Sequence, residues 1–454
     1  MRELRAGVSH EEDDQRNNKH GYFVSCDTTC VVIIMKIAIV GGGPCGLYLS
    51  DALSKTHDVT LYERENVLGG CWATHRDSAT GLFSEHAPRV MFDNYVNTID
   101  YFKERDIDFF ESFHKVYFVL YRTILNLKHF TPWDITAMGL AFVVTSTTWD
   151  GYSVKELCEI LNLSRGATTV IEDMCWAISV SYSKFSAKAY METLDICLTS
   201  SLYEAKGNSE TYMIPKLKPR SNVRVRTGFE FVDANGPNEA TFRTPTGNEI
   251  RERHDKLILC FPPKREKRMY YTGIGIQYHY DAPIKMKYPD TETIGSWRII
   301  VSYNYKERCV SSVVLNYRGA HKLDKRAMVR EAWKQITESL DLPKYSRATV
   351  VDSVYKENGR WKSRHGAFYL NDKNETIPHA HANYDYVGSH NTRSFPFTSF
   401  ESAVISAKEY LNASKLLKEK IKILKPHSLK YYVYGLLIAA LAAALLYFTK
   451  SVQC

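Results

Sequence analysis

The opening part of the chain alternates short apolar runs with an amphipathic stretch. Residues 36–40 read Lys-Ile-Ala-Ile-Val, a β-branched run that predicts a buried parallel strand. Residues 47–55 carry their apolar side chains on one helical face, and residues 59–62 form a second apolar run. A strand, a helix and a strand in this order are typical of an α/β fold with a parallel sheet.

Further elements follow from the same kind of pattern. Apolar residues at helical spacing predict helices over residues 94–104, 154–161, 323–340 and 398–411, with several more between 167 and 198. Ser153 and Glu156 form a capping box that opens the second of these helices. Residues 223–232, 240–249 and 255–261 read as strands, of which the first two form a hairpin and the last is ended by Pro262 and Pro263.

A glycine-rich turn joins the first predicted strand to the first predicted helix. Gly41, Gly43 and Gly46 complete the pattern G-x-G-x-x-G, and Pro44 and Cys45 lie between the second and third glycines. The first glycine allows a tight turn, the second lets the backbone approach a pyrophosphate, and the third lets helix and strand pack closely. The helix start offers free N–H groups and a positive dipole. These five residues are therefore predicted to bind a dinucleotide.

An acidic residue ends the second predicted strand. Glu63 lies 22 residues after Gly41, a spacing at which a carboxylate accepts hydrogen bonds from ribose hydroxyls. An acid at this place argues against a 2′-phosphate. The stretch then continues through Arg64 into a second glycine pair, Gly69 and Gly70. We therefore count Glu63, Arg64 and the glycine pair among the predicted cofactor contacts.

The continuation E-x5-G-G resembles the FAD-dependent amine oxidase family, including its monoamine oxidase-like members. The resemblance covers residues 36–412 and rests on the first glycine motif, the second glycine pair, the strand ended by two prolines, and residues 388–403. It implies a Rossmann-type FAD-binding domain with an inserted α+β substrate domain. It also implies non-covalent FAD, because residues 361–369, where some members carry a flavin-linking cysteine, have none.

The resemblance implies further contacts on the flavin side. Gly388 and Ser389 match the last FAD strand, and Thr398 and Ser399 match the start of a helix whose N–H groups point at the flavin in that family. Arg89 would place a positive charge beside the ring, where such a charge stabilises the reduced anionic flavin. Its neighbour in the same loop, His86, reads more simply as a hydrogen-bonded structural histidine.

The chain departs from the family pattern at three of these places. Cys71 stands where an arginine usually follows the glycine pair, which leaves Arg76 or Arg89 to supply that charge. Ser389 replaces a usual acid, and Ser399 falls near the second aromatic residue of the family's amine cage. Many members also carry a lysine that holds a water on flavin N5. Here Lys285 and Arg298 both remain candidates for that catalytic role.

The activity that the resemblance implies is a two-electron oxidation of an amine. A C–H bond next to the nitrogen delivers hydride to the flavin, the imine is hydrolysed, and oxygen reoxidises the flavin to give hydrogen peroxide. Two alternatives stay open. One is a flavin-dependent desaturase or protoporphyrinogen oxidase-type enzyme that acts on an apolar substrate. The other is a degenerate, non-catalytic flavoprotein attached to a membrane.

The net charge and the positions of the cysteines indicate which kinds of partner the protein binds. The net charge is +8, but six lysines against one glutamate lie between residues 415 and 430, which indicates a local basic patch rather than a nucleic-acid-binding body. The ten cysteines show no C-x-x-C pair and no metal-ligand spacing, so no metal site is predicted. The expected partners are a small-molecule substrate and a lipid bilayer, and a homodimer is left open.

The bilayer expectation rests on the C-terminal end. Residues 431–448 form an 18-residue run without charge and with tyrosines at both ends, enough to cross a bilayer at ~1.5 Å rise per residue if the bilayer thins locally. The lysines before it predict that the enzyme domain faces the cytoplasm, attached to the membrane by this tail. Residues 1–34 are polar and are predicted to be disordered.

These observations divide the chain into consecutive parts. The FAD-binding domain is predicted in three pieces, and the substrate domain in two. The FAD-binding domain comprises residues 35–105, 221–265 and 376–412, and the substrate domain comprises residues 106–220 and 266–375. Residues 1–34 precede them as an extension. Residues 413–430 follow as a basic linker, and residues 431–448 form the transmembrane helix.

Overall fold

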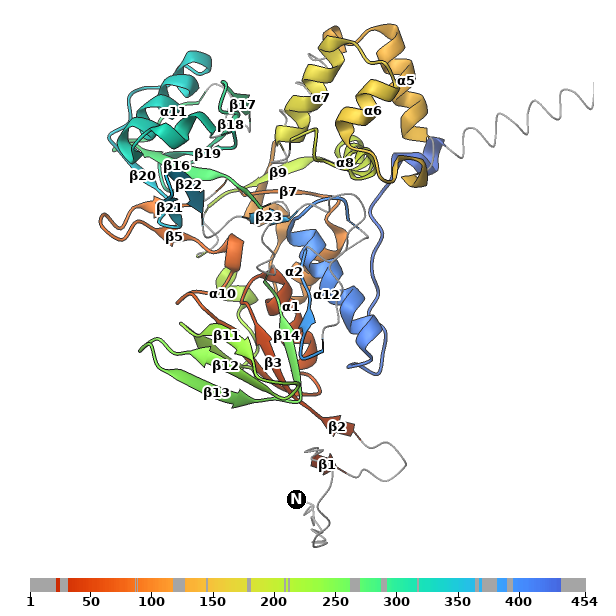
Figure 1. Ribbon diagram of the computed structural model, residues 1–454, viewed down its shortest axis with the longest axis vertical. Coiled ribbons are helices and arrows are strands. Elements are labelled where there is room, and N and C mark those ends of the chain that lie inside the picture. Colours follow the sequence, from red (N-terminus) through yellow and green to blue (C-terminus); the bar gives the residue numbers. More distant parts are fainter. Residues whose placement is uncertain are drawn as a thin grey trace, which may run out of the picture.

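The computed structural model shows three packed units (Figure 1). A parallel sheet with its helices lies at the bottom of the view, an antiparallel sheet with one long helix at the upper left, and a group of helices at the upper right. The structure describes residues 22–24, 32–85, 87, 89–116, 127–143, 146–177, 181–207, 210, 213–261, 270–286, 292–316, 318–363, 367–369, 382–389 and 395–433.

The parallel sheet confirms the predicted α/β unit. Its strands lie in the order β10 (Arg224–Thr227), β4 (Asp58–Glu63), β3 (Lys36–Val40), β14 (Lys256–Leu259) and β24 (Asp385–Tyr386), all parallel. Numbered along the chain, this order is 3-2-1-4-5, the doubly wound arrangement. The strand order reverses between β3 and β14. Ligands of such sheets bind at this point, beyond the carboxyl ends of the strands.

Both faces of the parallel sheet are covered. Ile37 and Ile39 of β3 pack towards α1 (Pro44–Leu53), α2 (Val96–Glu104) and α12 (Phe400–Ser414). Ala38 and Val40 point the other way, onto the meander β11 (Glu230–Ala234), β12 (Glu239–Arg243) and β13 (Glu249–Arg253). A strand buried on both faces explains the continuous apolar run in the sequence.

One predicted strand is divided between two sheets. Residues 223–232 were expected to form a single strand, but Gly228 adopts φ +76° between β10 and β11. Glycine tolerates this left-handed conformation, and the chain there leaves the parallel sheet for the meander. The prediction of one continuous strand was therefore wrong, whereas the predicted hairpin with the next strand is confirmed by the antiparallel pair β11 and β12. Residues 240–249 are likewise divided, because β12 ends at Arg243 and β13 begins at Glu249.

The antiparallel sheet forms the upper left unit. Its strands lie in the order β17 (Glu292–Ile294), β18 (Ile299–Asn304), β19 (Cys309–Val314), β16 (Ile274–His279) and β20 (Arg347–Val350). Helix α11 (Lys325–Ser339) confirms the helix expected over 323–340 and buries Met328, Ala332 and Ile336 against one face of this sheet. The opposite face looks towards the segment that follows β5 (His75–Arg76) and β6 (Phe83–Ser84).

The helical unit contains α5 (Pro132–Val143), α6 (Val154–Ile160), α7 (Arg165–Ala177) and α8 (Ala187–Thr199), which share one apolar core. The predicted capping box is present, because Ser153 and Glu156 bond each other's backbone N–H groups. A three-stranded sheet of β7 (Val90–Phe92), β9 (Leu202–Ala205) and β8 (Phe113–Val116) joins the lower and upper parts of the molecule.

Shorter elements complete the described chain. The remaining helical turns are α3 (Phe109–Ser112), α10 (Ile214–Leu217), η1 (Gly70–Trp72), η2 (Leu127–His129), η3 (Ser146–Trp149) and η4 (Arg318–Lys322). The remaining strand pairs are β15 (Tyr270–Thr272) with β23 (Ala367–Tyr369), β21 (Val354–Glu357) with β22 (Arg360–Ser363), and β1 (Tyr22–Val24) with β2 (Val32–Ile34). The last pair corrects the expectation that residues 1–34 are disordered throughout.

The basic segment after α12 is a fixed strap, which we define as residues 415–430. Three asparagines each donate to and accept from its backbone: Asn412 at Ile421, Asn97 at Leu424 and Asn94 at His427, at 2.7–2.9 Å. Contacts at every third residue suit an extended chain with three residues per turn. Leu416, Leu417, Ile421 and Ile423 pack on the core of the parallel-sheet unit. The segment predicted as a linker is therefore bound to the folded part of the chain.

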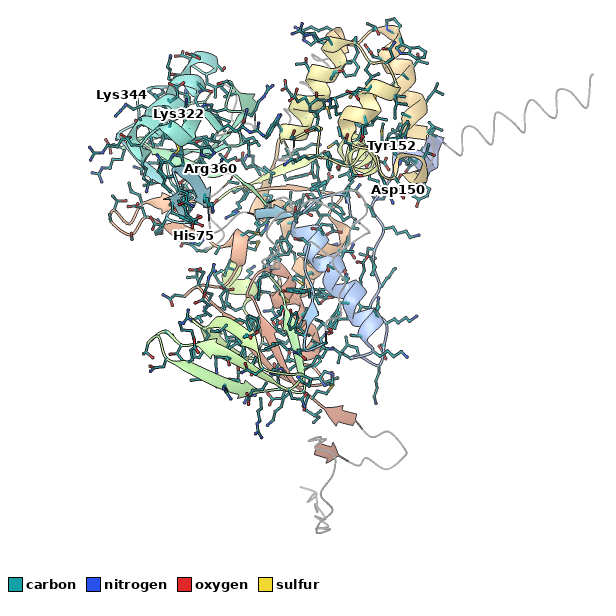
Figure 2. The ribbon with its side chains drawn as sticks, in the orientation of Figure 1. His75, Asp150, Tyr152, Lys322, Lys344 and Arg360 are labelled. Carbon is teal, nitrogen blue, oxygen red and sulfur yellow. The ribbon has the colours of Figure 1, made fainter. Side chains whose placement is uncertain are left out.

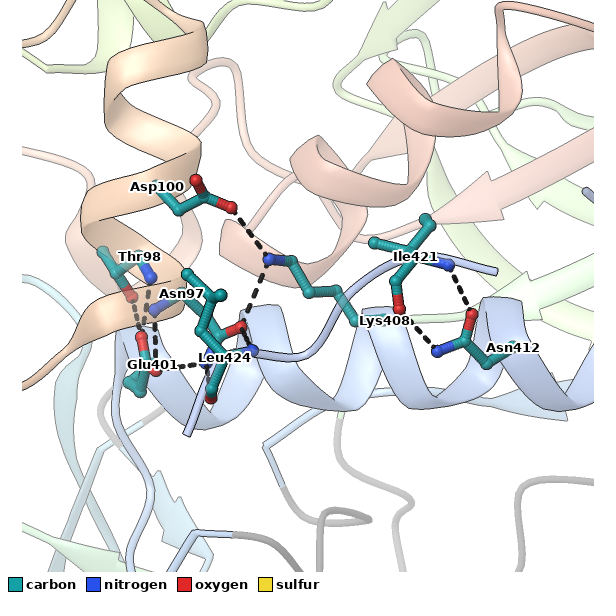
Figure 3. Close-up of polar contacts among 8 residues, drawn as sticks. All are labelled: Asn97, Thr98, Asp100, Glu401, Lys408, Asn412, Ile421 and Leu424. Atoms are coloured by element: carbon teal, nitrogen blue, oxygen red, sulfur yellow. Dashed lines mark hydrogen bonds and ion pairs between the residues drawn. The ribbon is translucent and has the colours of Figure 1, made fainter. Parts of the chain in front are cut away.

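A buried polar cluster ties α2 to α12 (Figure 3). The Glu401 carboxylate accepts the backbone N–H groups of Asn97 and Thr98, together with the Asn97 amide and the Thr98 hydroxyl, at 2.7–3.0 Å. The Lys408 ammonium lies 3.2 Å from Asn97 Oδ1 and 3.3 Å from Asp100 Oδ2. All four polar sites of the Asn97 amide are thus used, because the strap residue Leu424 takes the rest.

Several sequence predictions fall outside the described residues. These are His86, Pro262 and Pro263, most of residues 1–34, and all but the first three residues of the expected membrane segment 431–448. Among the residues that the structure does describe, no helix combines the length and the apolar character needed to cross a membrane.

Candidate cofactor and substrate site

The glycine loop after β3 has the backbone geometry that the sequence predicts. Gly41 adopts φ +108° and donates its N–H to the Tyr62 carbonyl at 2.8 Å. A Cβ on Gly46 would lie 1.9 Å from the Gly41 oxygen, so only glycine fits there. A Cβ on Gly43 would meet nothing closer than Gly70 Cα at 3.8 Å. Two glycines therefore close the turn, and the third leaves open space beside the backbone.

The start of α1 faces this open space. Pro44 is the first helical residue, and the N-cap, Gly43, has no side chain to bond the first-turn N–H groups. Cys45 is buried and donates its thiol to the Val387 carbonyl at 3.3 Å. That bond brings the end of β24, with buried Gly388 and half-buried Ser389, next to the helix start. An uncapped helix N-terminus of this kind suits a phosphate group.

Glu63 is held at the end of β4. Its carboxylate accepts the Gly42 N–H at 2.6 Å and the Glu65 N–H at 2.9 Å, and burial raises its pKa. The acid is therefore oriented towards the loop by the backbone itself, where a ribose hydroxyl can reach it. Arg64 points away and forms an exposed ion pair with Glu65 at 3.0 Å.

The second glycine pair packs directly on the first loop. Gly69 adopts φ +119° and donates its N–H to the Gly42 carbonyl at 2.8 Å. Gly70 adopts φ +55°, and a Cβ on it would lie 2.9 Å from Gly43 Cα. The two glycine motifs, separated in sequence, thus form one surface. Because Gly43 and Gly70 are both only half-buried and carry no side chain, the residues present fit a dinucleotide cofactor.

Arg89 lies against Cys71, the residue that replaces the family arginine. Its guanidinium donates to the carbonyls of Cys71 and Ala73 and pairs with Glu85 at 3.3 Å. It also lies 5.3 Å from the centre of the Trp72 ring, a cation–π distance. Of the two candidates for the missing charge, Arg89 is the one beside the glycine pair. Arg76 instead forms ion pairs with the exposed Glu210 and the half-buried Glu307.

The start of α12 joins the same region. Ser399 is the N-cap and forms a capping box with Ser402, so the helix begins at Phe400, two residues after the predicted Thr398. The Phe400 ring packs edge-on against Trp72, with centroids 5.5 Å apart. Trp72 thus contacts both Arg89 and the start of α12. This arrangement brings the predicted flavin-side residues next to the glycine pair.

The two candidates for the family lysine lie elsewhere. Arg298 precedes β18 in a turn with φ +51° and pairs with Asp173 of α7 at 2.5 Å. It therefore lies just before the strand and not within it. Lys285 is exposed in the loop after β16. The structure records no contact between either residue and the glycine loops. The catalytic role of both residues therefore stays a prediction.

A polar pocket lies between the loop of Arg89 and the antiparallel sheet. Phe83, Glu85 and Arg89 come from one side, Ser302, Asn304 and Ser311 from β18 and β19, and Glu204, Ala205 and Gly207 from the end of β9. Glu85 is 3% exposed, and burial raises its pKa to about 7 although Arg89 lowers it. Glu204 is 5% exposed, with the His114 imidazole 3.9 Å away.

The pocket belongs to a wider polar sheet face. Gln277 donates to the Glu85 carbonyl at 2.5 Å, and Thr349 donates to the Phe83 carbonyl at 3.2 Å, which fastens the loop to the sheet. Ser311 is 3% exposed, and its hydroxyl has no hydrogen-bond partner within the described chain. A buried hydroxyl that lines a pocket in this way can bond a ligand.

Sequence reasoning missed this pocket. Glu85 lies beside His86 in a loop that the sequence had marked, but the serines of β18 and β19 look ordinary. The signal available in the sequence was the alternation of polar positions in β18 with Ile299, Val301 and Tyr303, which face α11. It indicates a strand with one polar, buried face.

Comparisons with known proteins agree with the fold. Residues 39–105 match the family model of the NAD(P)-binding Rossmann-like domain. Comparison with curated proteins gives no significant match. Among solved structures, an oxidoreductase from Methanosarcina mazei is 14% identical, with a TM-score of 0.56 over 83% of this chain and 100% of that one.

Two further solved structures are similar. Wild-type putrescine oxidase bound to putrescine is 13% identical over 85% of this chain and 99% of that one, with a TM-score of 0.57. A putative protoporphyrinogen oxidase from an Exiguobacterium species is 12% identical over 85% and 99%, with a TM-score of 0.57. Identities this low bear on the fold alone. The chain therefore shares its fold with these oxidases, and residues 39–105 are similar to an NAD(P)-binding Rossmann-like domain.

Proposed function

We propose that the protein is an FAD-dependent oxidoreductase that oxidises an amine, with non-covalent FAD and oxygen as the electron acceptor. The observation that carries the amine assignment is the pocket beside Arg89. Two buried carboxylates, Glu85 and Glu204, lie there with one guanidinium, and Arg89 already bonds Glu85 and two carbonyls. With both acids ionised, the lining has a net negative charge that a substrate ammonium would balance.

The cofactor assignment rests on the joined glycine motifs. Gly41, Gly43 and Gly46 would hold the pyrophosphate with the start of α1, and Glu63 would bind the ribose. Gly70, Arg89 and the start of α12 at Ser399 would lie towards the flavin. When bound, FAD would supply the two-electron acceptor. The chain's own residues would exclude water and orient the substrate nitrogen towards it.

The first experiment is the visible spectrum of the purified full chain, followed by anaerobic addition of a panel of amines. We expect flavin absorption that bleaches with at least one amine and recovers with oxygen, accompanied by hydrogen peroxide. Flavin that no amine reduces would contradict the amine assignment. Protein that neither retains nor binds FAD would contradict the enzyme assignment and favour a non-catalytic role.

A second candidate is dehydrogenation of an apolar substrate. Ile300, Val313 and Leu315 lie on the same sheet face as the polar pocket and pack with Ala87 and Trp176. The three side chains are buried beside the pocket, and apolar neighbours of this kind would favour a hydrocarbon or an aromatic ring over a small amine. Flavin that is reduced by a hydrophobic porphyrinogen or a polyene precursor, and not by amines, would identify this activity.

Glu85 should make amine binding depend on pH. Since its pKa is about 7, the carboxylate becomes charged as the pH rises through that value. A cationic amine should therefore bind more tightly at about pH 8 than at about pH 6, a range in which methylamine stays protonated. In Glu85→Gln this rise should vanish. Affinity at the higher pH should fall about 10- to 100-fold, since a charge-assisted hydrogen bond contributes about 1.5–3 kcal/mol.

Titration of the flavin spectrum with methylamine measures this affinity. Glu210→Gln is the matched control, because that carboxylate is exposed and pairs with Arg76. The control should keep the wild-type pH profile. A wild-type affinity that does not change between the two pH values would exclude Glu85 as the titrating group.

We also propose that residues 431–448 anchor the protein in a membrane, with the enzyme body on the cytoplasmic side. The support is their length, their lack of charge, and the lysines that precede them. Resistance of the full chain to alkaline carbonate extraction from membranes tests this anchor. Release of the full chain by carbonate would contradict it.

A further inference from the structure

Helix α5 has an outward face without charge. Trp133, Ile135 and Leu140 are 56%, 52% and 61% exposed, and the other exposed positions of this helix are Pro132, Thr136 and Gly139. The one charged residue of α5 is Asp134, which is fully buried and accepts the N–H groups of Thr131 and Ser164 at 2.7 Å. Helices at a protein surface normally direct charged side chains to water. This face needs an apolar contact.

The chain leaves the described structure beside this helix. Leu429 packs on the same core as Ala141 and Phe142 of α5, and its N–H donates to Asp195 at 2.8 Å. The Lys430 ammonium lies 5.3 Å from the centre of the Phe142 ring. Tyr431 and Tyr432 are 65% and 67% exposed. The uncharged run of residues 431–448 therefore begins next to α5.

Figure 2 shows the side chains in the same part of the molecule. Asp150 and Tyr152 are labelled at the base of the helical unit, next to the end of the strap. Tyr152 is 42% exposed, and Asp150 pairs with Lys188 at 3.4 Å. Tyr152 thus adds one exposed aromatic side chain near the end of the strap, and tyrosine is a residue type enriched in the headgroup region of a bilayer.

Figure 1 shows that the strap runs along the same edge of the molecule. Its exposed lysines are Lys415, Lys418, Lys420, Lys422 and Lys425. Asn97 and Asn94 fix the strap backbone at Leu424 and His427, so the lysines are presented from a held segment and not from a free tail. Lysines held close to an anionic leaflet each contribute favourably to binding, within a Debye length.

We infer that the exposed face of α5 and the lysines of the strap form a docking surface for an anionic bilayer. Trp133, Ile135 and Leu140 enter the headgroup boundary while the lysines attract the acidic lipid. This inference rests on the proposed tail anchor, which brings the membrane to this corner. It adds that the folded body of the proposed enzyme contacts the bilayer directly and is not attached to it through the tail anchor alone.

Trp133 makes the inference directly testable in the full chain. The chain has seven tryptophans and none after residue 361. Trp72, Trp149, Trp297 and Trp361 are buried, whereas Trp133 is 56% exposed. In vesicles that contain acidic lipid and acyl chains brominated near the headgroups, ~5–10 Å deep, we expect the wild-type tryptophan emission to be quenched. Trp133→Phe keeps the apolar face and should remove that quenching.

Controls separate this result from other outcomes. Trp333→Phe removes a half-buried tryptophan on α11 and should leave the quenching in place. Neutral vesicles, or the triple variant Lys420→Glu, Lys422→Glu and Lys425→Glu, should reduce it. Emission that is blue-shifted but not quenched would mean that the tail or a second copy covers α5, and would overturn the inference. Carbonate extraction and the flavin spectrum of the same samples report separately on the anchor and on the proposed enzyme.

Discussion

The Gly43→Val protein is expected to fold and to purify without flavin. Gly43 has φ −77° and ψ −178°, a conformation that valine adopts readily. An added Cβ there meets no atom closer than 3.8 Å. The valine methyl groups would instead fill the space between the two glycine motifs, where the backbone must approach a pyrophosphate. Cofactor binding should thus be lost, while stability is little changed.

Two other glycines serve as controls. Gly139→Val places the same side chain in α5, where nothing lies within 4 Å of the new Cβ, and should keep its flavin. Gly46→Val places the Cβ 1.9 Å from the Gly41 oxygen and should disrupt folding itself. The measurements are the ratio of flavin to protein absorption and the thermal unfolding midpoint. Normal flavin content in the Gly43 variant would contradict the placement of the cofactor.

The sequence predicted this part of the fold because its signals are local. The apolar run of β3, the three glycines and the acid at Glu63 lie within 28 residues, from position 36 to position 63. Each has one physical task that its residue type reveals. The helix over 323–340 and the capping box at Ser153 were likewise readable, since spacing along one helix determines both.

The pocket and the strap could not be predicted in this way, because their partners are far apart in sequence. Glu85 and Ser311 line the same pocket only after two sheets pack together. The Asn97 amide binds the Leu424 backbone, although the two residues are 327 positions apart in the sequence. Lysine-rich composition suggested a solvated linker, yet three asparagine amides bind its backbone.

Glu401→Ala should strongly destabilise the protein without preventing it from folding. The carboxylate is fully buried and accepts four hydrogen bonds, from Asn97 and Thr98 at the start of α2. Helix α2 has no capping side chain of its own, since Tyr95 occupies the N-cap position. A residue of α12 therefore caps α2 (Figure 3). The sequence had marked residues 398–403 for a flavin contact, whereas the acid among them has this structural task.

Removal of that carboxylate leaves four buried donors, on Asn97 and Thr98, without the acceptor that they share. We expect the free energy of unfolding to fall by about 3–5 kcal/mol, the cost typical of breaking a buried charged network. Glu401→Gln keeps one acceptor oxygen and should lose less. Glu419→Ala removes an exposed carboxylate of the strap and should change the free energy by less than about 0.5 kcal/mol.

Equilibrium urea unfolding of the three variants, with a check of refolding, measures these differences. Because Phe400 packs on Trp72, loosening of α12 should also weaken FAD binding. FAD affinity and stability should thus fall together in Glu401→Ala, whereas Gly43→Val loses the cofactor at nearly unchanged stability. Equal stability of Glu401→Ala and Glu419→Ala would show that the cluster does not fasten α2 to α12, and the coupling between strap, helix and cofactor site would then need another origin.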